Sequence, residues 1–432
     1  MCSGARGKRL FRSGWQQPDD WDAVTGLCFL DAEGHYHDNG LSRVRTFDKL
    51  VNPEQSPFFN WTKPFVQLET TRGCFNTCAF CVSGGEKPVR TLSIEAIRAR
   101  VRLIHEKGIR NIRVLDRTFN YQSHRAKALF DLFREFPDMR FHLEIHPALL
   151  SEELKRELAS MPNGLLHLEA GIQSLHEEVL TVSRRAGKLS DALEGLRYLC
   201  SLDNMETHAD LIAGLPLYHL SQIFEDVRTL AEYRAGEIQL ESLKLLPGTE
   251  MRRRAKELGI CYSPLPPYEV LQTREITPDE LQTARQLSRL LDGFYNATAW
   301  QEVTRRLIVE EPDFLTRFLN HLIQIGVIDQ PMGLERRGIL LYQFCKAHYP
   351  HFLTAMSRAW IEAGMSLKKE PAERVRTKHV TPPEVWTVCT GTYRDDLRLC
   401  KLPAPEEGRC YWYGFETESQ QLRPVFTAVS EE

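Results

Sequence analysis

The sequence places three cysteines, Cys74, Cys78 and Cys81, on one short stretch directly after an apolar run. Cysteine thiolates bind zinc or iron–sulfur clusters, and a closed tetrahedral site needs four ligands. No cysteine lies between Cys81 and Cys200, and the nearest downstream histidine, His105, falls in a segment with a helical pattern. The spacing is not that of two C-x-x-C zinc knuckles. Three thiolates on one loop therefore favour a 4Fe-4S cluster in which one iron stays open for an exogenous ligand.

The elements that must position this loop are strands and helices that alternate six times. Strand-like runs are FVQLET, IRVLD, FHLEIHP, LLHLEAGIQ, THADLIAGLP and EIQLESLKLLPG, and helices are expected at about 93–107, 123–135, 151–160, 190–200 and 221–233. Strands joined by helical crossovers predict a parallel sheet, and six units favour a partial (β/α)6 barrel over a closed eight-unit barrel. A doubly wound sheet is the alternative. In either fold, the chemistry lies at the carboxyl ends of the strands.

The flanking regions differ from this core, which we expect to span residues 61–262. Residues 1–60 contain short strand-like pieces and form a lead-in without a convincing long helix. Residues 263–432 are expected to form a helical C-terminal domain, in which Thr277 and Glu280 predict a capping box with Pro278 at the first helical position. The last sixty residues alternate like a small antiparallel sheet. The expected fold class is therefore α/β, a partial barrel followed by helices and a small β region.

Composition limits the classes of partner and compartment. The 432 residues carry a formal net charge of −3, so nucleic acid is not expected as the main partner. The basic N-terminal stretch lacks the apolar run of a signal peptide, and no run of apolar residues is long enough to cross a membrane. Eleven cysteines without a secretion signal indicate reduced thiols, which favours a cytoplasmic protein without a membrane partner.

The spacing C-x-x-x-C-x-x-C, with the aromatic Phe80 directly before Cys81, resembles the signature of the radical S-adenosylmethionine (SAM) superfamily. The resemblance implies that Cys74, Cys78 and Cys81 hold a 4Fe-4S cluster, with Phe80 beside the cofactor. The open iron would bind the amino and carboxylate groups of SAM, and an electron from the cluster would cleave SAM to a 5'-deoxyadenosyl radical. A flavodoxin or ferredoxin would supply the electron, and the substrate, a small molecule or a peptide, stays unknown.

The strand ends carry further residues that the resemblance assigns to SAM. The stretch EAGIQSLHEEVLTVSRR resembles the fourth-strand signature of the branch with oxygen-independent coproporphyrinogen oxidases and methylthiotransferases. This implies that Gln173 hydrogen-bonds the cofactor and that Arg185, rather than its neighbour Arg184, pairs with the cofactor carboxylate. Glu144 in LEIHP would accept hydrogen bonds from the ribose hydroxyls, and Asp210 in DLIAGLP would serve similarly.

One strand end departs from the family pattern. Where the superfamily often carries a glycine-rich turn after the second strand, this chain has VLDRTFN, with Asp116 and Thr118 in place of glycines. Asp116 is carried over as a cofactor contact on that resemblance. The stretch from Leu245 to Pro247 would pass the adenine.

The region after the barrel resembles a domain of unknown function attached to bacterial cobalamin-domain radical enzymes. Only 73 residues precede Cys74, the D-x-H-x-x-G motif is absent, and a doubly wound domain needs more than about a hundred residues. Cobalamin is therefore not expected as a bound cofactor, and its domain is truncated, lost or supplied by another chain. The expected function is a radical SAM enzyme of unknown substrate. The alternatives are a non-catalytic iron–sulfur electron carrier and a scaffold remnant.

Overall fold

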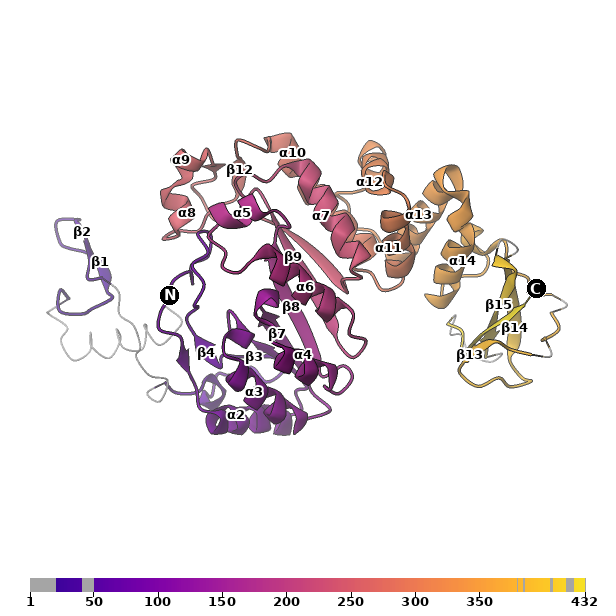
Figure 1. The fold of residues 1–432 in the computed structure, drawn as a ribbon, viewed down its shortest axis with the longest axis horizontal. Helices are drawn as coiled ribbons and strands as arrows, with labels where there is room; N and C mark the ends of the chain where they lie inside the picture. The colour runs from indigo at the N-terminus through magenta and orange to yellow at the C-terminus, as the bar shows by residue number, and fades with distance from the viewer. Residues whose placement is uncertain are drawn as a thin grey trace.

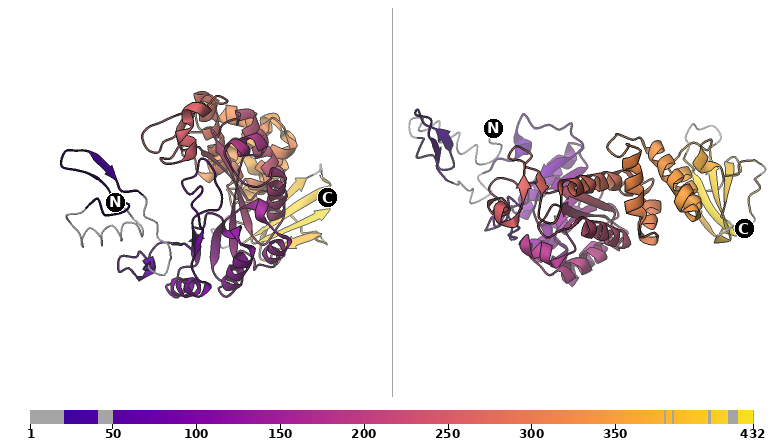
Figure 2. Two further views of the ribbon diagram at one scale, coloured as in Figure 1. Left: turned by 60° about the vertical axis from the view of Figure 1, so that its left-hand side comes forward. Right: turned by 90° about the horizontal axis from the view of Figure 1, so that it is seen from above.

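The chain forms a barrel-like core that continues into a row of helices and ends in a small sheet (Figure 1). This computed structural model describes residues 21–40, 50–378, 380–383, 385–404, 407–416 and 423–431. An N-terminal hairpin of β1 (Cys28–Leu30) and β2 (Tyr36–Asp38) stands apart from the core in all three ribbon views (Figures 1 and 2). The small sheet lies at the opposite end of the molecule.

Six parallel strands form the central sheet, in the order in which they occur along the chain. Their order is β3-β6-β7-β8-β9-β10, and every neighbouring pair is parallel. A doubly wound sheet would reverse its strand order at a switch point, and this sheet does not. The predicted partial (β/α)6 barrel is confirmed. The strands are β3 (Val66–Leu68), β6 (Asn111–Val114), β7 (Arg140–Ile145), β8 (Leu166–Gln173), β9 (Glu206–Ala213) and β10 (Glu237–Ser242).

Helices cover the outer face of this curved sheet (Figure 1). Along β7, Phe141 and Leu143 are buried in the main hydrophobic core, whereas the alternate residues His142 and Glu144 face the barrel interior. The predicted helices are confirmed with ends shifted by at most two residues, partly because Ser93 and Ser151 cap two of them through their side chains. The covering helices are α2 (Ile94–Glu106), α3 (Ser123–Arg134), α4 (Glu152–Ala159), α6 (Leu189–Cys200) and α7 (Leu220–Glu232).

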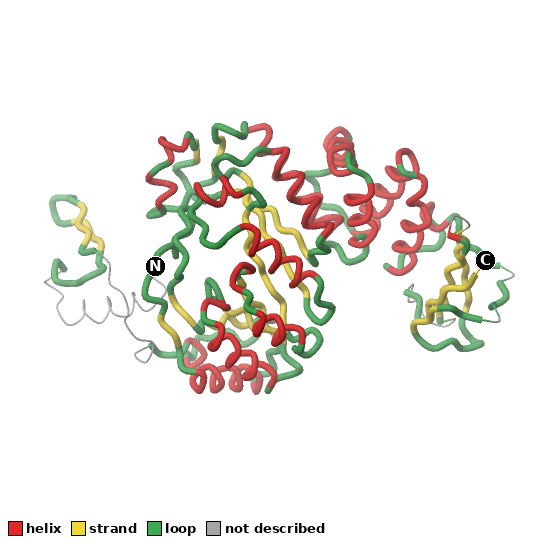
Figure 3. The backbone as a smooth tube through the Cα atoms, in the orientation of Figure 1, coloured by secondary structure: helices red, strands yellow, loops and turns green. Residues whose placement is uncertain are grey.

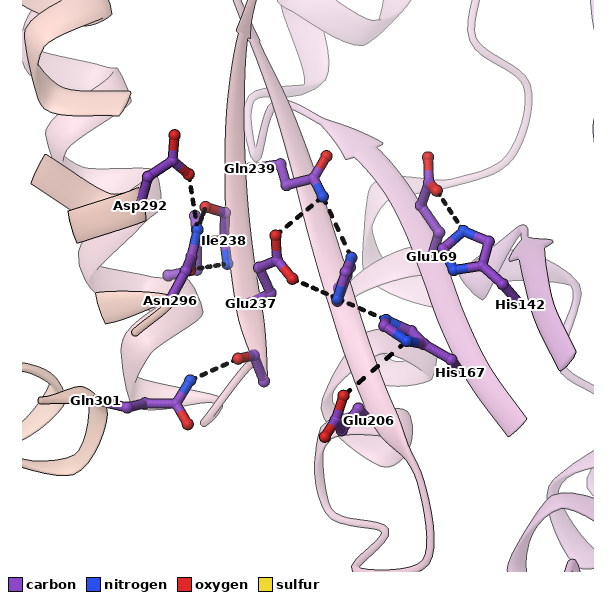
Figure 4. A network of polar contacts seen from close by, with 12 residues as sticks. His142, His167, Glu169, Glu206, Glu237, Ile238, Gln239, Asp292, Asn296 and Gln301 are labelled. Atoms are coloured by element: carbon purple, nitrogen blue, oxygen red, sulfur yellow. Dashed lines mark hydrogen bonds and ion pairs between the residues drawn. The ribbon is translucent and has the colours of Figure 1, made fainter. Parts of the chain in front are cut away.

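The helical region closes the β10 edge of the sheet. Helix α10 (Pro278–Leu290) begins with the predicted capping box at Thr277 and continues into a π-helical turn, η5 (Leu291–Tyr295). Asn296 directly after this turn accepts from the Ile238 N–H at 3.0 Å and donates to the Ile238 carbonyl at 3.0 Å (Figure 4). An uncovered edge strand would leave these backbone groups unpaired. Asn296 therefore pairs with the backbone of β10 at Ile238, as a neighbouring strand would.

The C-terminal part contains the expected helices and antiparallel sheet. Helices occupy the middle of this part and strands its end (Figure 3). The helices are α11 (Gln301–Glu310), α12 (Phe314–Gln324), α13 (Leu334–His348) and α14 (Leu353–Glu362). The sheet has the order β13-β16-β15-β14, with β13 (Val388–Thr390), β14 (Arg398–Ala404), β15 (Arg409–Phe415) and β16 (Phe426–Glu431). The boundaries at residues 60 and 262 stay predictions.

Several short elements were not predicted. Helix α5 (Glu177–Val182) follows β8, and two short helices, α8 (Glu250–Arg253) and α9 (Ala255–Leu258), follow β10. Two hairpins also escaped prediction, β4 (Thr71–Arg72) with β5 (Arg90–Thr91), and β11 (Cys261–Tyr262) with β12 (Val270–Gln272). Short 3-10 turns are η2 (Pro53–Gln55), η3 (Phe119–Tyr121), η4 (Pro147–Leu149), η6 (Pro350–Phe352) and η7 (Glu370–Ala372).

Candidate functional site

The loop with the three cysteines begins at the carboxyl end of β3, and the β4–β5 hairpin closes its base. Cys74 and Cys78 are buried and Cys81 is half-buried. The backbone N–H of Cys74 donates to the Glu86 carbonyl at 3.1 Å, and that of Cys81 donates to the Cys78 carbonyl at 3.2 Å. These hydrogen bonds join residues of the same loop. Local backbone contacts therefore fix the positions of the cysteines at the mouth of the barrel.

A close backbone approach shapes this loop at Gly84. A Cβ atom at this position would lie 2.6 Å from the Cys78 carbonyl oxygen and 3.0 Å from that of Cys81. Only glycine allows the chain to return so closely past two of the cysteines. Gly84 therefore helps to set the backbone path that orients the cysteine thiols, although it is not a ligand itself.

A second loop, which follows β8 and α5, packs directly on the cysteine loop. The Ala79 N–H donates to the Ser183 carbonyl at 2.8 Å. Arg185 points to the same place: its Nη1 lies 3.7 Å from Cys78 Sγ, and its Nη2 donates to the Gly171 carbonyl. Arg184 turns away, is half exposed and pairs with Glu250 at 2.5 Å. The structure thus brings Arg185, and not Arg184, to the cysteines.

The donor set at this loop fits an iron–sulfur cluster with three protein ligands. In the described parts of the chain, no three His, Cys, Asp or Glu side chains converge on a point where they could hold a single metal ion. A cubane cluster does not require such convergence, because each thiolate binds a different iron. Burial raises the pKa of the Cys78 thiol, and the Arg185 guanidinium acts in the opposite direction by favouring the thiolate. The loop therefore offers three soft ligands beside one fixed cation.

The end of β8 is irregular where Gln173 lies. Gln173 has a positive φ of 73°, and the register between β8 and β9 shifts between Gly171 and Gln173. A Cβ atom at Gly171 would lie 2.5 Å from Gln173 Nε2 and 3.6 Å from Arg185 Nη2. Glycine at 171 therefore leaves the space in which the predicted glutamine and arginine come together.

Three carboxylates line the barrel interior on adjacent strands. Glu144 of β7 and Glu169 of β8 are directly paired in the register, and Asp210 of β9 pairs with Gly171, two residues beyond Glu169. Burial raises the pKa of Glu144 to about 6. Burial also raises the pKa of Asp210 to about 8, and the neighbouring Glu169 acts in the same direction. The two predicted acids thus belong to one row, whose middle member, Glu169, was missed.

Below this row lies a polar network that sequence reasoning also missed (Figure 4). His142 contacts Glu169 at 2.7 Å, His167 and His208 contact each other through their Nε2 atoms at 2.5 Å, and His208 contacts Glu237 at 2.6 Å. Burial lowers the pKa of His167 to about 3, which keeps this imidazole neutral. The available signal was the polar residue at every second position of β7, β8 and β9, which marks the inward face of each strand.

Two predicted cofactor residues have partners inside the protein. The Asp116 carboxylate accepts from the Thr70 and Thr71 N–H groups, both at 2.8 Å, and from the Thr70 hydroxyl. Its contacts tie β6 to the start of the cysteine loop. Phe80 packs partly buried against the main hydrophobic core. Their roles as cofactor contacts stay predictions, as do those of Glu144, Gln173, Arg185 and Asp210.

A small cavity lies beside the cysteine loop. Its lining includes Cys74, Thr118, Gln122 and Arg125. Thr118 Oγ1 lies 3.8 Å from Cys74 Sγ, so the turn after β6 reaches the first cysteine.

A parallel partial barrel that carries three cysteines on the loop after its first strand defines a class of cluster-binding α/β domains. Residues 68–230 match the model of the Radical SAM superfamily, and this part of the chain is therefore a radical SAM domain. Residues 256–356 match a second model, described as a protein of unknown function, DUF4080. The resemblances predicted from the cysteine spacing and from the C-terminal region are both confirmed.

Curated relatives match less than half of the chain. The tRNA-2-methylthio-N(6)-dimethylallyladenosine synthase of Herpetosiphon aurantiacus is 26% identical over 213 residues, which cover 45% of this chain and 47% of that protein. The enzyme of the same name from Chlorobium luteolum is 31% identical over 158 residues, which cover 34% and 35%. The chain thus spans half or less of the length of these relatives.

Solved structures show lower identity. The radical SAM methyltransferase TsrM of Kitasatospora setae, with tryptophan and a SAM analogue bound, has a TM-score of 0.47 at 15% identity, covering 63% of this chain and 56% of that chain. The cobalamin-dependent radical enzyme OxsB has a TM-score of 0.49 at 14% identity, covering 80% and 58%. Among the described residues, no helix combines the length and apolar character that a membrane span requires.

Proposed function

We propose that this protein is a radical SAM enzyme that cleaves SAM reductively and acts on a substrate of unknown structure. Cys74, Cys78 and Cys81 would hold a 4Fe-4S cluster and leave its fourth iron for SAM. The observation that most directly supports this proposal is the contact of Arg185 with the cysteine loop, in which Nη1 lies 3.7 Å from Cys78 Sγ. A guanidinium fixed beside an open iron is where a cofactor carboxylate can form a charge-assisted pair.

When bound, the cluster and SAM would supply one-electron cleavage of a carbon–sulfur bond of SAM. The protein's own residues bind and orient. Arg185 would pair with the SAM carboxylate, and Gln173 would hydrogen-bond the cofactor beside it. Glu144 lies on β7 and Asp210 on β9, the two strands that flank β8. Both would accept hydrogen bonds from SAM hydroxyls. Glu144 and Glu169, the members of this row that are ionised at neutral pH, also favour a cofactor that carries positive charge.

The partners of the proposed enzyme follow from the same chemistry. The cluster needs a reductant, for which we propose a small electron-transfer protein such as a flavodoxin or ferredoxin in the cytoplasm. No two cysteines of the described residues form a disulfide, which supports a reducing compartment. The tRNA substrate named for the curated relatives is not carried over, because a net charge of −3 gives no basic surplus for nucleic acid. Cobalamin is not part of the proposal.

The test is anaerobic reconstitution with iron and sulfide, followed by reduction in the presence of SAM. We expect about four irons per chain, a SAM-dependent change in the electron paramagnetic resonance spectrum and formation of 5'-deoxyadenosine. Cys74→Ala, Cys78→Ala and Cys81→Ala should each abolish these signals, whereas the exposed Cys261→Ala should leave them unchanged. A full cluster whose spectrum ignores SAM and that forms no 5'-deoxyadenosine would refute the proposal and favour an electron carrier.

A further inference from the structure

Ala186, the residue directly after Arg185, is held at both its backbone N–H and its carbonyl by buried side chains. The Ala186 N–H donates to Asn76 Oδ1 at 3.0 Å, and the Ala186 carbonyl accepts from His146 Nε2 at 3.1 Å. Asn76 is 3% exposed and His146 is 4% exposed, whereas Ala186 itself lies at the surface. Ala186 has little burial to hold it in place, so these two hydrogen bonds add to that between Ala79 and the Ser183 carbonyl in fixing this segment.

We call Asn76 and His146 together the clamp. Each of the two residues belongs to a different element of the proposed cofactor site. Asn76 lies between Cys74 and Cys78, and its side chain also accepts from the Thr77 N–H at 3.1 Å. His146 follows β7, two residues after Glu144. Its backbone is fixed in turn by Asn120, whose side-chain amide exchanges two hydrogen bonds with it at 2.8 and 2.9 Å. The clamp therefore joins the cysteine loop, the end of β7 and the arginine segment.

The chemistry of His146 suits a fixed anchor. The Ala186 carbonyl can only accept, so Nε2 must carry a ring proton. Nδ1 is buried and has no hydrogen-bond partner. Burial lowers the pKa of His146 to about 3, and the charge of Arg185 acts in the same direction. The imidazole thus stays a neutral donor over the whole range of physiological pH.

We propose that Asn76 and His146 are positioning residues that act on SAM through Arg185, by fixing the backbone of Ala186 on both sides and hence the guanidinium beside Cys78. This role rests on the proposed function. Neither residue needs to touch the cofactor. Loss of either hydrogen bond lets the arginine segment move away from the cysteine loop, so the cluster should form while SAM binds more weakly.

Matched substitutions separate this role from general damage. Asn76→Leu removes the acceptor at similar size, whereas Asn76→Asp keeps an oxygen in its place. His146→Leu removes the donor, whereas His146→Gln can place an amide N–H near the Nε2 position. Asn204→Leu is the control: Asn204 donates to the Leu158 and Met161 carbonyls, both at 2.9 Å, and precedes β9 at the opposite end of the strands.

The first readout needs neither cluster nor SAM. In metal-free protein, hydrogen exchange of a peptide spanning residues 183–187 should be about tenfold faster in Asn76→Leu and His146→Leu, as expected when one buried hydrogen bond is lost. Asn76→Asp and His146→Gln should stay near wild type, and Asn204→Leu should not affect this peptide. Unchanged exchange in both leucine variants would overturn the clamp.

The second readout uses reconstituted protein and the spectral change that SAM induces. Both leucine variants should bind about four irons and SAM about tenfold more weakly, with recovery in the conservative variants. If Asn76→Leu loses the cluster, His146→Leu decides, because it lies outside the cysteine loop. Wild-type SAM affinity in His146→Leu would overturn the positioning role of the clamp and leave the proposed function standing. A wild-type protein that binds no SAM would instead overturn the proposed function, while the exchange experiment still decides the clamp.

Discussion

The Nη1 atom of Arg185 lies 3.7 Å from the sulfur of Cys78, across 107 residues of chain. The same guanidinium donates through Nη2 to the Gly171 carbonyl at the end of β8. Arg185 therefore links the cysteine loop after the first strand to the irregular end of the fourth strand. It also places a permanent positive charge beside Cys78, whose thiolate form is otherwise disfavoured by burial.

Substitution of Arg185 should separate cofactor binding from cluster binding. Arg185→Gln removes the charge, and a charge-assisted pair contributes about 1.5–3 kcal/mol, so SAM affinity should fall about 10- to 100-fold. Iron content should stay near wild type because Arg185 is not a ligand. The measurement is a SAM titration of the reconstituted cluster by electron paramagnetic resonance.

Arg184→Gln is the matched control for this substitution. It removes the neighbouring arginine, which pairs with Glu250 and does not reach the cysteines. A surface ion pair contributes little, so stability and SAM affinity should both change little. A larger loss of SAM affinity in Arg184→Gln than in Arg185→Gln would reverse the assignment.

A methyl group at Gly84 should prevent the loop from holding a cluster. In Gly84→Ala the new Cβ would clash with the Cys78 and Cys81 carbonyl oxygens, so the backbone must shift and move two ligands. Iron content after reconstitution should fall to half or less, measured against protein concentration. Gly333→Ala, before α13, meets nothing within 4 Å and should load normally. Full iron content in Gly84→Ala would show that the loop adopts another path when metal binds.

The sequence predicts what local chemistry controls and fails where distant parts of the chain meet. Helices α2 and α4 were predictable because Ser93 and Ser151 cap them within one turn. The six strands were predictable from their apolar runs. Helix α5 was missed because it has six residues and no side-chain cap.

The candidate site divides in the same way. The three cysteines are adjacent on one loop and could be found by their spacing. Asn76 contacts Ala186 across 110 residues, and nothing in the local pattern marks it. Glu169 occupies an inward position on its strand, but its neighbours on β7 and β9 are known only from the register. Contacts of this kind depend on the tertiary fold and require the structure.

The carboxyl of Asp210 should make the stability of the metal-free protein depend on pH. Its pKa of about 8 in the folded state exceeds the ordinary value of 3.8, so the folded protein holds this proton more tightly than the unfolded chain. The stabilisation is fully present below about pH 4 and is lost as the pH rises through about 8. Asp210→Asn stays neutral and should avoid this loss.

Urea denaturation of wild type and Asp210→Asn at pH 6 and pH 8.5 tests this expectation. The variant should gain stability relative to wild type between the two pH values, on the order of 1 kcal/mol or more. Asp203→Asn changes an exposed carboxylate just before β9 and serves as the control, with no such gain. A variant that loses stability relative to wild type as the pH rises would contradict a protonated Asp210.

Asn296 should be essential for attaching the helical region to the sheet. Its side chain pairs with both backbone groups of Ile238, and Tyr295 and Gln301 add hydrogen bonds to the carbonyls of Ala235 and Gly236, both at 2.6 Å. Asn296→Leu would leave the Ile238 N–H and carbonyl without partners beneath a packed helix, which costs about 1–3 kcal/mol for each buried group. The free energy of unfolding should fall by about 2–4 kcal/mol, and the Ile238 amide should exchange faster. Asn111→Ala removes a single exposed bond of 3.4 Å to the Pro64 carbonyl at the opposite edge and should change stability by about 0.5 kcal/mol or less. Equal losses in the two variants would show that β10 does not depend on this asparagine for its edge.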